Sequence, residues 1–293
     1  MSVLVCENIT KIKRNKPSIR NFNYNFLDNQ IYAIVGKSDS GKELLLQLIT
    51  ARIKADSGYI YLDGEPLTNN RKMNERLCYL ANDADFPGHL QIKTICKVMA
   101  SFYPKWDNAY AYELLDFFKI NFKRNYRNLD ENQKELLIGI LGLASRANIT
   151  VLNNPLNNVD IKNRFDYFNL LYNHHLRYPR TLILTTNHID ELETIVDKVL
   201  FLDNGILFEN FTIQEIRNNF RYLSGKSEVL KSLISNIKII GYEEREKYLT
   251  VCVPRKLSKD ETRKFQRYLI DIAEVPIQKI FIYLINLREL KGI

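Results

Sequence analysis

The order of hydrophobic and polar residues along the chain alternates between a strand-like and a helix-like period. Residues 31–35 form an apolar run that is typical of a buried strand, and residues 43–52 continue it with a helical pattern. Strands alternate with helices over much of the chain, which predicts an α/β fold with a parallel sheet covered on both faces. The other expected strands are 3–11, 21–27, 59–62, 77–80, 149–152, 181–185 and 199–202, and the other expected helices are 161–174 and 190–196.

A helical segment interrupts this alternation at about residues 89–146. Ile92, Ile95 and Val98 fall on one apolar helical face, and Asp107 is placed to cap a second helix. A third helix is expected from Asp130 to about residue 143. The pattern therefore predicts a helical insert within the α/β part of the chain.

A smaller unit follows the α/β part. Its strands are expected at residues 238–241 and 248–253, and its helices at 258–272 and 277–287. Ser258 and Glu261 have the spacing of a capping box at the start of the first of these helices. We therefore expect one domain over residues 1–222 and a small α+β domain over residues 226–293.

The most informative chemical motif lies between the apolar run 31–35 and the helix that follows it. Residues Gly36 to Glu43 read GKSDSGKE and match G-x-x-x-x-G-K, the pattern of a phosphate-binding loop. Glycines let backbone N–H groups turn toward an anion, the helix N-terminus adds its dipole, and Lys42 adds a positive charge. The last position normally carries a Ser or Thr hydroxyl for Mg²⁺, but here it is Glu43.

The net charge of the chain indicates which classes of binding partner would suit it, but it does not single out one of them. The formal net charge of +8 suits a nucleotide, a nucleic acid or an anionic membrane surface, although a solvated basic surface explains it equally well. No run of eighteen apolar residues predicts a membrane span, and residues 1–10 lack the layout of a signal peptide. His174 and His175 are adjacent on an expected helix and do not face each other, so we expect them at the surface.

The order of elements, together with residues 149–160, resembles the nucleotide-binding subunit of an ABC transporter from residue 3 to about residue 220. Residues 102–107 and 277–284 look like a narrower group, the ATPases of bacterial exporters of peptides and antibiotics, which includes bacitracin-type and phenol-soluble-modulin exporters. The resemblance implies an ABC-type α/β core with a mixed sheet, an N-terminal antiparallel strand layer and a helical insert. It also implies the ligands ATP and Mg²⁺ and a cytoplasmic location at the inner face of the membrane. The implied partners are a membrane-spanning subunit, docked around residues 82–101, and a second nucleotide-binding subunit, with no nucleic acid.

The family's motifs can be carried over to this sequence position by position, and most of them are altered. In the phosphate-binding loop, which also contains Lys37 and Ser38, Asp39 stands where the family has a glycine. The aromatic residue that stacks on adenine would fall near Lys13, and the Q-loop glutamine and the switch histidine correspond to Asn82 and Asn187. The positions that fit the loop motif are Gly36, Ser40, Gly41 and Lys42.

The motifs around hydrolysis depart from the family in the same way. The Walker B strand ends in Asn153 and Asn154, where the resemblance implies a metal-binding Asp and a general-base Glu. The D-loop position keeps Asp160. The signature motif, which the family places across a dimer interface, reads Leu129, Asp130, Glu131, Asn132 and Gln133.

Each of these departures has a chemical consequence. Asn154 cannot accept a proton, and loss of a general base typically costs about 10²–10⁴ in rate. Glu43, Asn82 and Asn153 are the positions implied to surround Mg²⁺, so Glu43 could replace the carboxylate that Asn153 lacks. The alternative is that Glu43 or Asp39 forms an ion pair with Lys42 and closes the empty loop.

The altered motifs leave three hypotheses for the function of the protein. The first is a nucleotide-binding subunit of an ABC exporter that binds ATP weakly and hydrolyses it slowly or not at all. The second is an active exporter ATPase with compensating residues. The third is an ABC-like scaffold or regulatory protein that binds no nucleotide.

Overall fold

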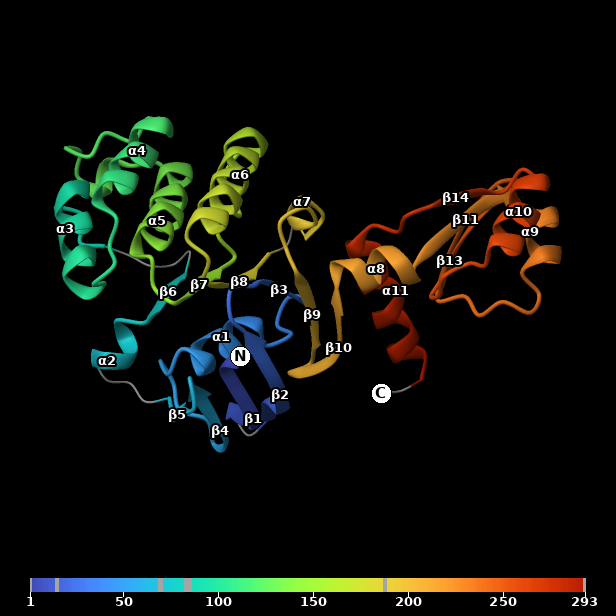
Figure 1. The fold of residues 1–293 in the computed structure, drawn as a ribbon, viewed down its shortest axis with the longest axis horizontal. Coiled ribbons are helices and arrows are strands. Elements are labelled where there is room, and N and C mark those ends of the chain that lie inside the picture. Colours follow the sequence, from blue (N-terminus) through green and yellow to red (C-terminus); the bar gives the residue numbers. More distant parts are fainter. Residues whose placement is uncertain (1, 14–15, 68–70, 82–85, 187–188, 292–293) are drawn as a thin grey trace. The chain divides into compact units, whose positions relative to one another are not determined.

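The computed structural model describes residues 2–13, 16–67, 71–81, 86–186 and 189–291 (Figure 1). The chain divides into two compact units, Met1–Asn210 and Phe211–Ile293. Among the described helices, none is both long enough and apolar enough to cross a bilayer.

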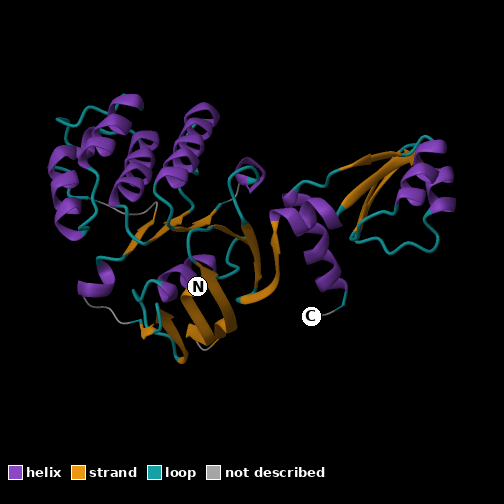
Figure 2. Ribbon diagram, in the orientation of Figure 1, coloured by secondary structure: helices purple, strands orange, loops and turns teal. Residues whose placement is uncertain are grey.

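The first unit is built on a sheet whose strands follow the order β10-β9-β3-β8-β7-β6. The strands β9, β3, β8, β7 and β6 pair in parallel, so their carboxyl ends lie along one edge. Their apolar runs are buried because helices cover the sheet, as Figure 2 shows for the part near α5 and α6. The strands are β3 (Ile31–Val35), β6 (Leu77–Ala81), β7 (Ile149–Asn153), β8 (Thr181–Thr185), β9 (Lys198–Asp203) and β10 (Ile206–Thr212).

An antiparallel layer packs on the same unit and confirms the predicted N-terminal strands. Its order is β2-β1-β4-β5, with β1 (Ser2–Lys13), β2 (Lys16–Leu27), β4 (Ser57–Leu62) and β5 (Glu65–Pro66). Helix α1 (Lys42–Ile49) contributes Leu45, Leu46, Leu48 and Ile49 to the hydrophobic core that this layer shares with the main sheet. The loop in front of α1 is thereby fixed at the edge of a well-packed core.

The helical insert lies together at one end of the first unit (Figure 1). It contains α3 (Ile92–Phe102), α4 (Asn108–Phe117) and α5 (Glu131–Ser145), and the Asp107 side chain caps α4 as the sequence predicts. Helix α6 (Ile161–Arg177) packs against α5, where the Tyr167 hydroxyl donates to the Gly139 carbonyl at 3.1 Å. The short helices α2 (Arg71–Asn74) and α7 (Ile189–Leu192) and a 3₁₀ turn at Tyr126–Asn128 complete the described helices of this unit.

The second unit is an α+β structure around the sheet β12-β13-β11-β14. The predicted capping box is present, because Ser258 and Glu261 exchange their side-chain and backbone hydrogen bonds at the start of α10. The elements are α8 (Ile213–Asn219), β11 (Arg221–Lys226), α9 (Ser227–Leu233), β12 (Gly241–Arg245), β13 (Tyr248–Val253), α10 (Lys259–Arg267), β14 (Asp271–Ala273) and α11 (Ile277–Leu290).

Four sequence-based expectations are wrong. The helix expected at residues 190–196 is shorter and spans Ile189–Leu192. The strand expected at residues 238–241 begins only at Gly241 and continues through the charged residues 242–245, which pair with β13. The helix expected to reach residue 272 ends at Arg267, because the chain turns at Leu269 (φ 56°) and then pairs with β11. His174 and His175 are buried rather than exposed, since α6 presents both to the protein interior.

Candidate functional site

The loop between β3 and α1 is held tightly at the carboxyl edge of the main sheet. A Cβ on Gly36 would lie 2.4 Å from the Leu202 carbonyl oxygen, so only glycine fits at this position. The Ser40 carbonyl accepts a hydrogen bond from the Gly205 N–H at 2.9 Å, which joins the loop to the turn after β9. The sequence-predicted loop is thus a rigid turn between strand and helix.

Two residues of this loop have left-handed backbone conformations. Gly41 (φ 97°) directly precedes α1, and Asp39 (φ 62°) lies two residues before it. Asp tolerates this region better than most residues because of its short polar side chain. Asp39 thus occupies a backbone conformation that the glycine implied by the resemblance would adopt freely, and it adds a carboxylate to the loop.

The Lys42 amine is directed back onto the loop. It donates to the carbonyls of Gly36 and Lys37, both at 2.7 Å, and to the Ser40 hydroxyl at 3.3 Å. Burial lowers the pKa of Lys42, and the nearby Asp39 carboxylate opposes that shift. Within the described residues Lys42 makes no ion pair with Asp39 or Glu43, so the expected alternative of a salt-bridged loop is wrong.

A cavity of about 510 Å³ opens in front of the loop and brings the predicted residues together. Asn153 and Asn154 reach it from the end of β7, and Lys13 reaches it from the end of β1, as the resemblance implies for the adenine side. The described lining includes nine residues that the sequence predicted for the site: Lys13, Ser38, Asp39, Ser40, Gly41, Lys42, Glu43, Asn153 and Asn154. It also includes four residues that were not predicted: Ser18, Leu44, Gln47 and Thr185.

Thr185 organises the two asparagines at the end of the Walker B strand. Its hydroxyl donates to Asn153 Oδ1 at 2.8 Å and accepts from the Asn154 backbone N–H at 2.7 Å. Asn154 has a left-handed backbone (φ 46°) at the point where the chain leaves β7. Sequence reasoning missed Thr185, although a polar residue that ends a buried strand next to β3 was a usable signal.

Glu43 lies in the first turn of α1 with an exposed side chain. Its Oε1 accepts a hydrogen bond from Gln47 Nε2 at 3.0 Å. A carboxylate at this point is stabilised by the helix dipole, so Glu43 is favourable for the helix with or without a ligand.

Two of the predicted signature and D-loop residues, Asp130 and Asp160, cap helices, and neither lines this cavity. Asp130 Oδ1 accepts from the Gln133 N–H at 2.8 Å at the start of α5. Asp160 accepts from the Asn163 N–H at 3.0 Å at the start of α6, and that bond lowers the pKa of the Asp160 carboxyl. Leu129 is buried, while Glu131 and Asn132 are exposed beside Asp130.

A buried carboxylate links these two helix starts and was missed from the sequence. Glu135, only 5% exposed, accepts from the Asn158 backbone N–H at 2.8 Å and from its side-chain amide at 2.6 Å. The signature helix and the segment before Asp160 are therefore joined directly. The two remaining predicted positions, Asn82 and Asn187, lie outside the described residues.

The cavity has the donors that a phosphate chain requires. The start of α1 supplies unpaired backbone N–H groups by the geometry of every helix, and Lys42 supplies an ammonium. For a cation, no group of three or more His, Cys, Asp or Glu side chains occurs among the described residues. Mg²⁺ is commonly held by one or two carboxylates together with substrate phosphates, so Glu43 and the Asn153 amide oxygen fit a metal that enters with a nucleotide.

Comparison with known proteins gives a consistent result. The family model described as ABC transporter matches residues 19–157. The ABC transporter ATP-binding protein YtrB of Bacillus subtilis (strain 168) is 25% identical over 241 residues, which cover 82% of each chain. The energy-coupling factor transporter ATP-binding protein EcfA2 of Staphylococcus epidermidis is 23% identical over 83% of this chain and 88% of its own.

A solved structure shows the same fold. The dimeric ATP-binding cassette MJ0796, bound to ADP and phosphate after hydrolysis, superposes with a TM-score of 0.64. It is 17% identical in sequence, and the match covers 72% of this chain and 98% of that one.

Proposed function

Since this chain carries the ATP-binding domain of the ABC transporter family and is an ATP-binding subunit of a transporter, we propose that it binds ATP weakly and hydrolyses it slowly or not at all. The observation that carries the proposal is the pair Asn153 and Asn154 in the cavity of the phosphate-binding loop. Neither side chain can accept a proton from an attacking water molecule. Absence of a general base typically costs about 10²–10⁴ in rate, which is enough to make turnover negligible beside a competent ATPase.

ATP and Mg²⁺ are the proposed ligands of this cavity. The first turn of α1 and Lys42 would hold the phosphates, and Glu43 would contact the metal ion that screens them. Without a metal ion, Asp39 and Glu43 would each repel the nucleotide. A pair of unit charges at about 4 Å is worth roughly 1 kcal/mol in water and several times more in a drier site, so affinity depends strongly on Mg²⁺.

A second cavity supports docking to a membrane-spanning subunit. It has a volume of about 540 Å³ and lies between the end of α1, strand β6 and helix α3. Phe86, Met99 and Phe102 line it, and Phe102 remains 58% exposed. A groove that is only partly apolar, with Arg52 and Asn74 beside the aromatic residues, suits an amphipathic segment of a partner, and the chain would then be held at the cytoplasmic face of the membrane.

The partner for nucleotide binding would be a second copy or a related subunit. The capped helix start at Asp130 and the neighbouring Glu131 and Asn132 are exposed and outside the chain's own cavity, which suits a position across a dimer. Asp130 would bring a negative charge toward the phosphates there. ATP binding at the interface of such a dimer would therefore be weakened by the carboxylates of the phosphate-binding loop on one side and by Asp130 on the other.

We assign the transporter to the export of peptides or antibiotics. The support is the resemblance of residues 102–107 and 277–284 to the ATPases of that group.

The test is to measure ATP binding and ATP turnover on the same preparation of the full chain. The proposal predicts Mg²⁺-dependent ATP binding that Lys42→Ala abolishes, together with turnover at least about 10²-fold below that of a competent family member. Absence of binding would favour a nucleotide-free scaffold. Turnover at the rate of a competent ATPase would show that compensating residues restore catalysis.

A further inference from the structure

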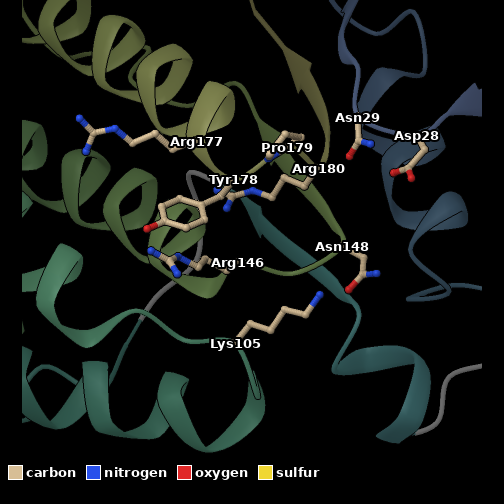
Figure 3. Close-up of a pocket in the computed structure, with 9 residues that line it drawn as sticks. All are labelled: Asp28, Asn29, Lys105, Arg146, Asn148, Arg177, Tyr178, Pro179 and Arg180. Carbon is tan, nitrogen blue, oxygen red and sulfur yellow. The ribbon is translucent and has the colours of Figure 1, made fainter.

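A basic cavity lies at the opposite edge of the main sheet from the phosphate-binding loop. It has a volume of about 560 Å³ and is formed where the chain enters β3, β7 and β8, at their amino ends (Figure 3). Asp28 precedes β3, Arg146 precedes β7 and Arg180 directly precedes β8. Because the nucleotide cavity is at the carboxyl ends of the same strands, the two sites do not overlap.

Positive charge predominates in this cavity. Lys105, Arg146, Arg177 and Arg180 line it, against the carboxylate of Asp28 among the described lining residues. Arg146 is paired with Asp107, which neutralises one of the four charges. In Figure 3 the Arg177 guanidinium lies at the margin of the group, the Arg146 and Arg180 side chains extend toward the same side, and the Lys105 side chain extends away from Arg146.

Arg180 is buried, and two of its hydrogen-bond donors have no acceptor within the described residues. It is only 5% exposed, and its Nη2 donates to the Leu143 carbonyl at 3.0 Å, at the end of α5. Its Nε and Nη1 are buried without a hydrogen-bond partner in the described part of the protein, and so is Nε of Arg146. Buried charged donors that lack acceptors are strongly unfavourable, so the stabilisation of the α5 terminus alone does not account for this side chain.

The two arginines also repel each other. Burial is the main cause that lowers the pKa of Arg180 to about 10, and the charge of Arg146 adds to it. Arg180 therefore stays protonated at neutral pH, and the cavity holds adjacent guanidinium groups. An anion in the cavity would offset this excess of positive charge and accept hydrogen bonds from the part of the lining that is open to it.

We propose that this cavity binds a small phosphate-bearing anion on the side of Arg146 and Arg180, with Lys105 adding positive charge from another part of the lining. Phosphate fits better than a monocarboxylate, because it has three acceptor oxygens and a charge that matches the excess of cations. The Tyr178 ring supports the arrangement by packing against Arg146, whose Cζ lies 3.5 Å from the ring centroid. The volume exceeds that of a bare ion and falls within the range of small-molecule sites, so a phosphate monoester is accommodated as well as inorganic phosphate.

The test measures binding of inorganic phosphate, glycerol 3-phosphate and acetate to the full chain by calorimetry. Lys42→Ala serves as the background, since it weakens the phosphate-binding loop without touching this cavity. Phosphate binding should persist in that background, acetate should not bind, and tighter binding of glycerol 3-phosphate than of phosphate would identify a monoester as the ligand. Equal affinity for the two would identify the free ion.

Two variants connect the binding to the cavity. Lys105→Glu changes an exposed residue and should weaken phosphate binding at least about tenfold, while Lys97→Glu, at an exposed position of α3 outside the cavity, should leave it unchanged. Arg180→Met should abolish the rise in melting temperature that phosphate produces. Equal phosphate affinity in the Lys105 and Lys97 variants would overturn the proposal, as would equal binding of acetate or loss of all phosphate binding in the Lys42→Ala background.

Discussion

The Gln47 amide donates a hydrogen bond to the Glu43 carboxylate, with 3.0 Å between Nε2 and Oε1. Both residues line the cavity of the phosphate-binding loop, one helical turn apart on α1. Lys42 does not share this contact, because its amine is occupied by the carbonyls of Gly36 and Lys37. The carboxylate of Glu43 is thus oriented by a neutral partner and remains available to a metal ion.

Replacement of Glu43 should change ATP affinity in opposite directions with and without Mg²⁺. With Mg²⁺ present, Glu43→Ala should weaken ATP binding by about tenfold, because a metal ligand is lost. With the metal chelated, the same variant should bind ATP a few times more tightly, since a charge worth roughly 1 kcal/mol of repulsion is removed. Equilibrium titration with a fluorescent ATP analogue measures both values.

Gln47→Ala is the matched control for this experiment, since it keeps the carboxylate and removes only its hydrogen-bond donor. We expect its Mg²⁺-dependent affinity to stay within about threefold of the unchanged protein. If Glu43→Ala and the unchanged protein bind Mg²⁺-ATP equally well, Glu43 is not a metal ligand.

Asp130 should matter for stability as well as for any nucleotide contact. Its side chain caps α5, so Asp130→Ala should lower the free energy of unfolding by about 1 kcal/mol. Asp130→Ser retains a capping hydroxyl and removes the charge, and it should unfold within about 0.5 kcal/mol of the unchanged protein. Urea denaturation followed by circular dichroism distinguishes the two variants. Identical losses in both would show that the cap is not the source of the effect.

Much of the fold was predictable because the buried strands carry unbroken apolar runs. β3 and β8 have the predicted bounds, and the strong N-cap residues Asp107 and Ser258 fixed two helix starts. β12 was misplaced because charged residues occupy an edge strand, where solvent exposure hides the hydrophobic pattern. α8 was overlooked although Thr212 and Glu215 form a capping box at its start.

The part of the candidate site that is contiguous in sequence was predictable. The part whose residues are brought together by tertiary packing was less so. The loop from Gly36 to Glu43 follows from its motif alone. The positions of Thr185 beside Asn153 and of Glu135 beside Asn158 depend on how strands and helices pack, so spacing could not reveal them. The burial of His174 likewise required the neighbouring α4, whose Tyr110 ring stacks on it at 4.2 Å.

His174 should make the protein less stable in mild acid. Burial is the main cause that lowers its pKa to about 3, and Arg180, Arg146, His175 and Arg177 add to the shift. As the pH falls, His174 therefore becomes protonated near pH 6.5 in the unfolded chain, but only near pH 3 in the folded protein. Neutral His174 costs the folded state no stability above pH 6.5, and the free energy of unfolding decreases progressively as the pH falls from 6.5 to about 3.

The variant His174→Phe keeps an aromatic ring against Tyr110 and removes the titrating group. The loss of stability between pH 6.5 and pH 4, measured by urea denaturation, should be smaller in this variant. It should not vanish, because burial also lowers the pKa of His175. An unchanged dependence on pH would show that folding does not lower the pKa of His174.

The central claim is that nucleotide binding survives in this chain while hydrolysis does not. It is tested most directly by the steady-state ATP turnover of the double variant Asn153→Asp, Asn154→Glu, compared with the unchanged protein at equal ATP occupancy. Restoring a metal-binding carboxylate and a general base beside the intact Thr185 should raise turnover by about 10²-fold or more. High turnover in the unchanged protein, equal to that of the double variant, would contradict the claim, whereas equally low turnover in both would place the catalytic defect at Glu43, Asp130 or the missing adenine stack.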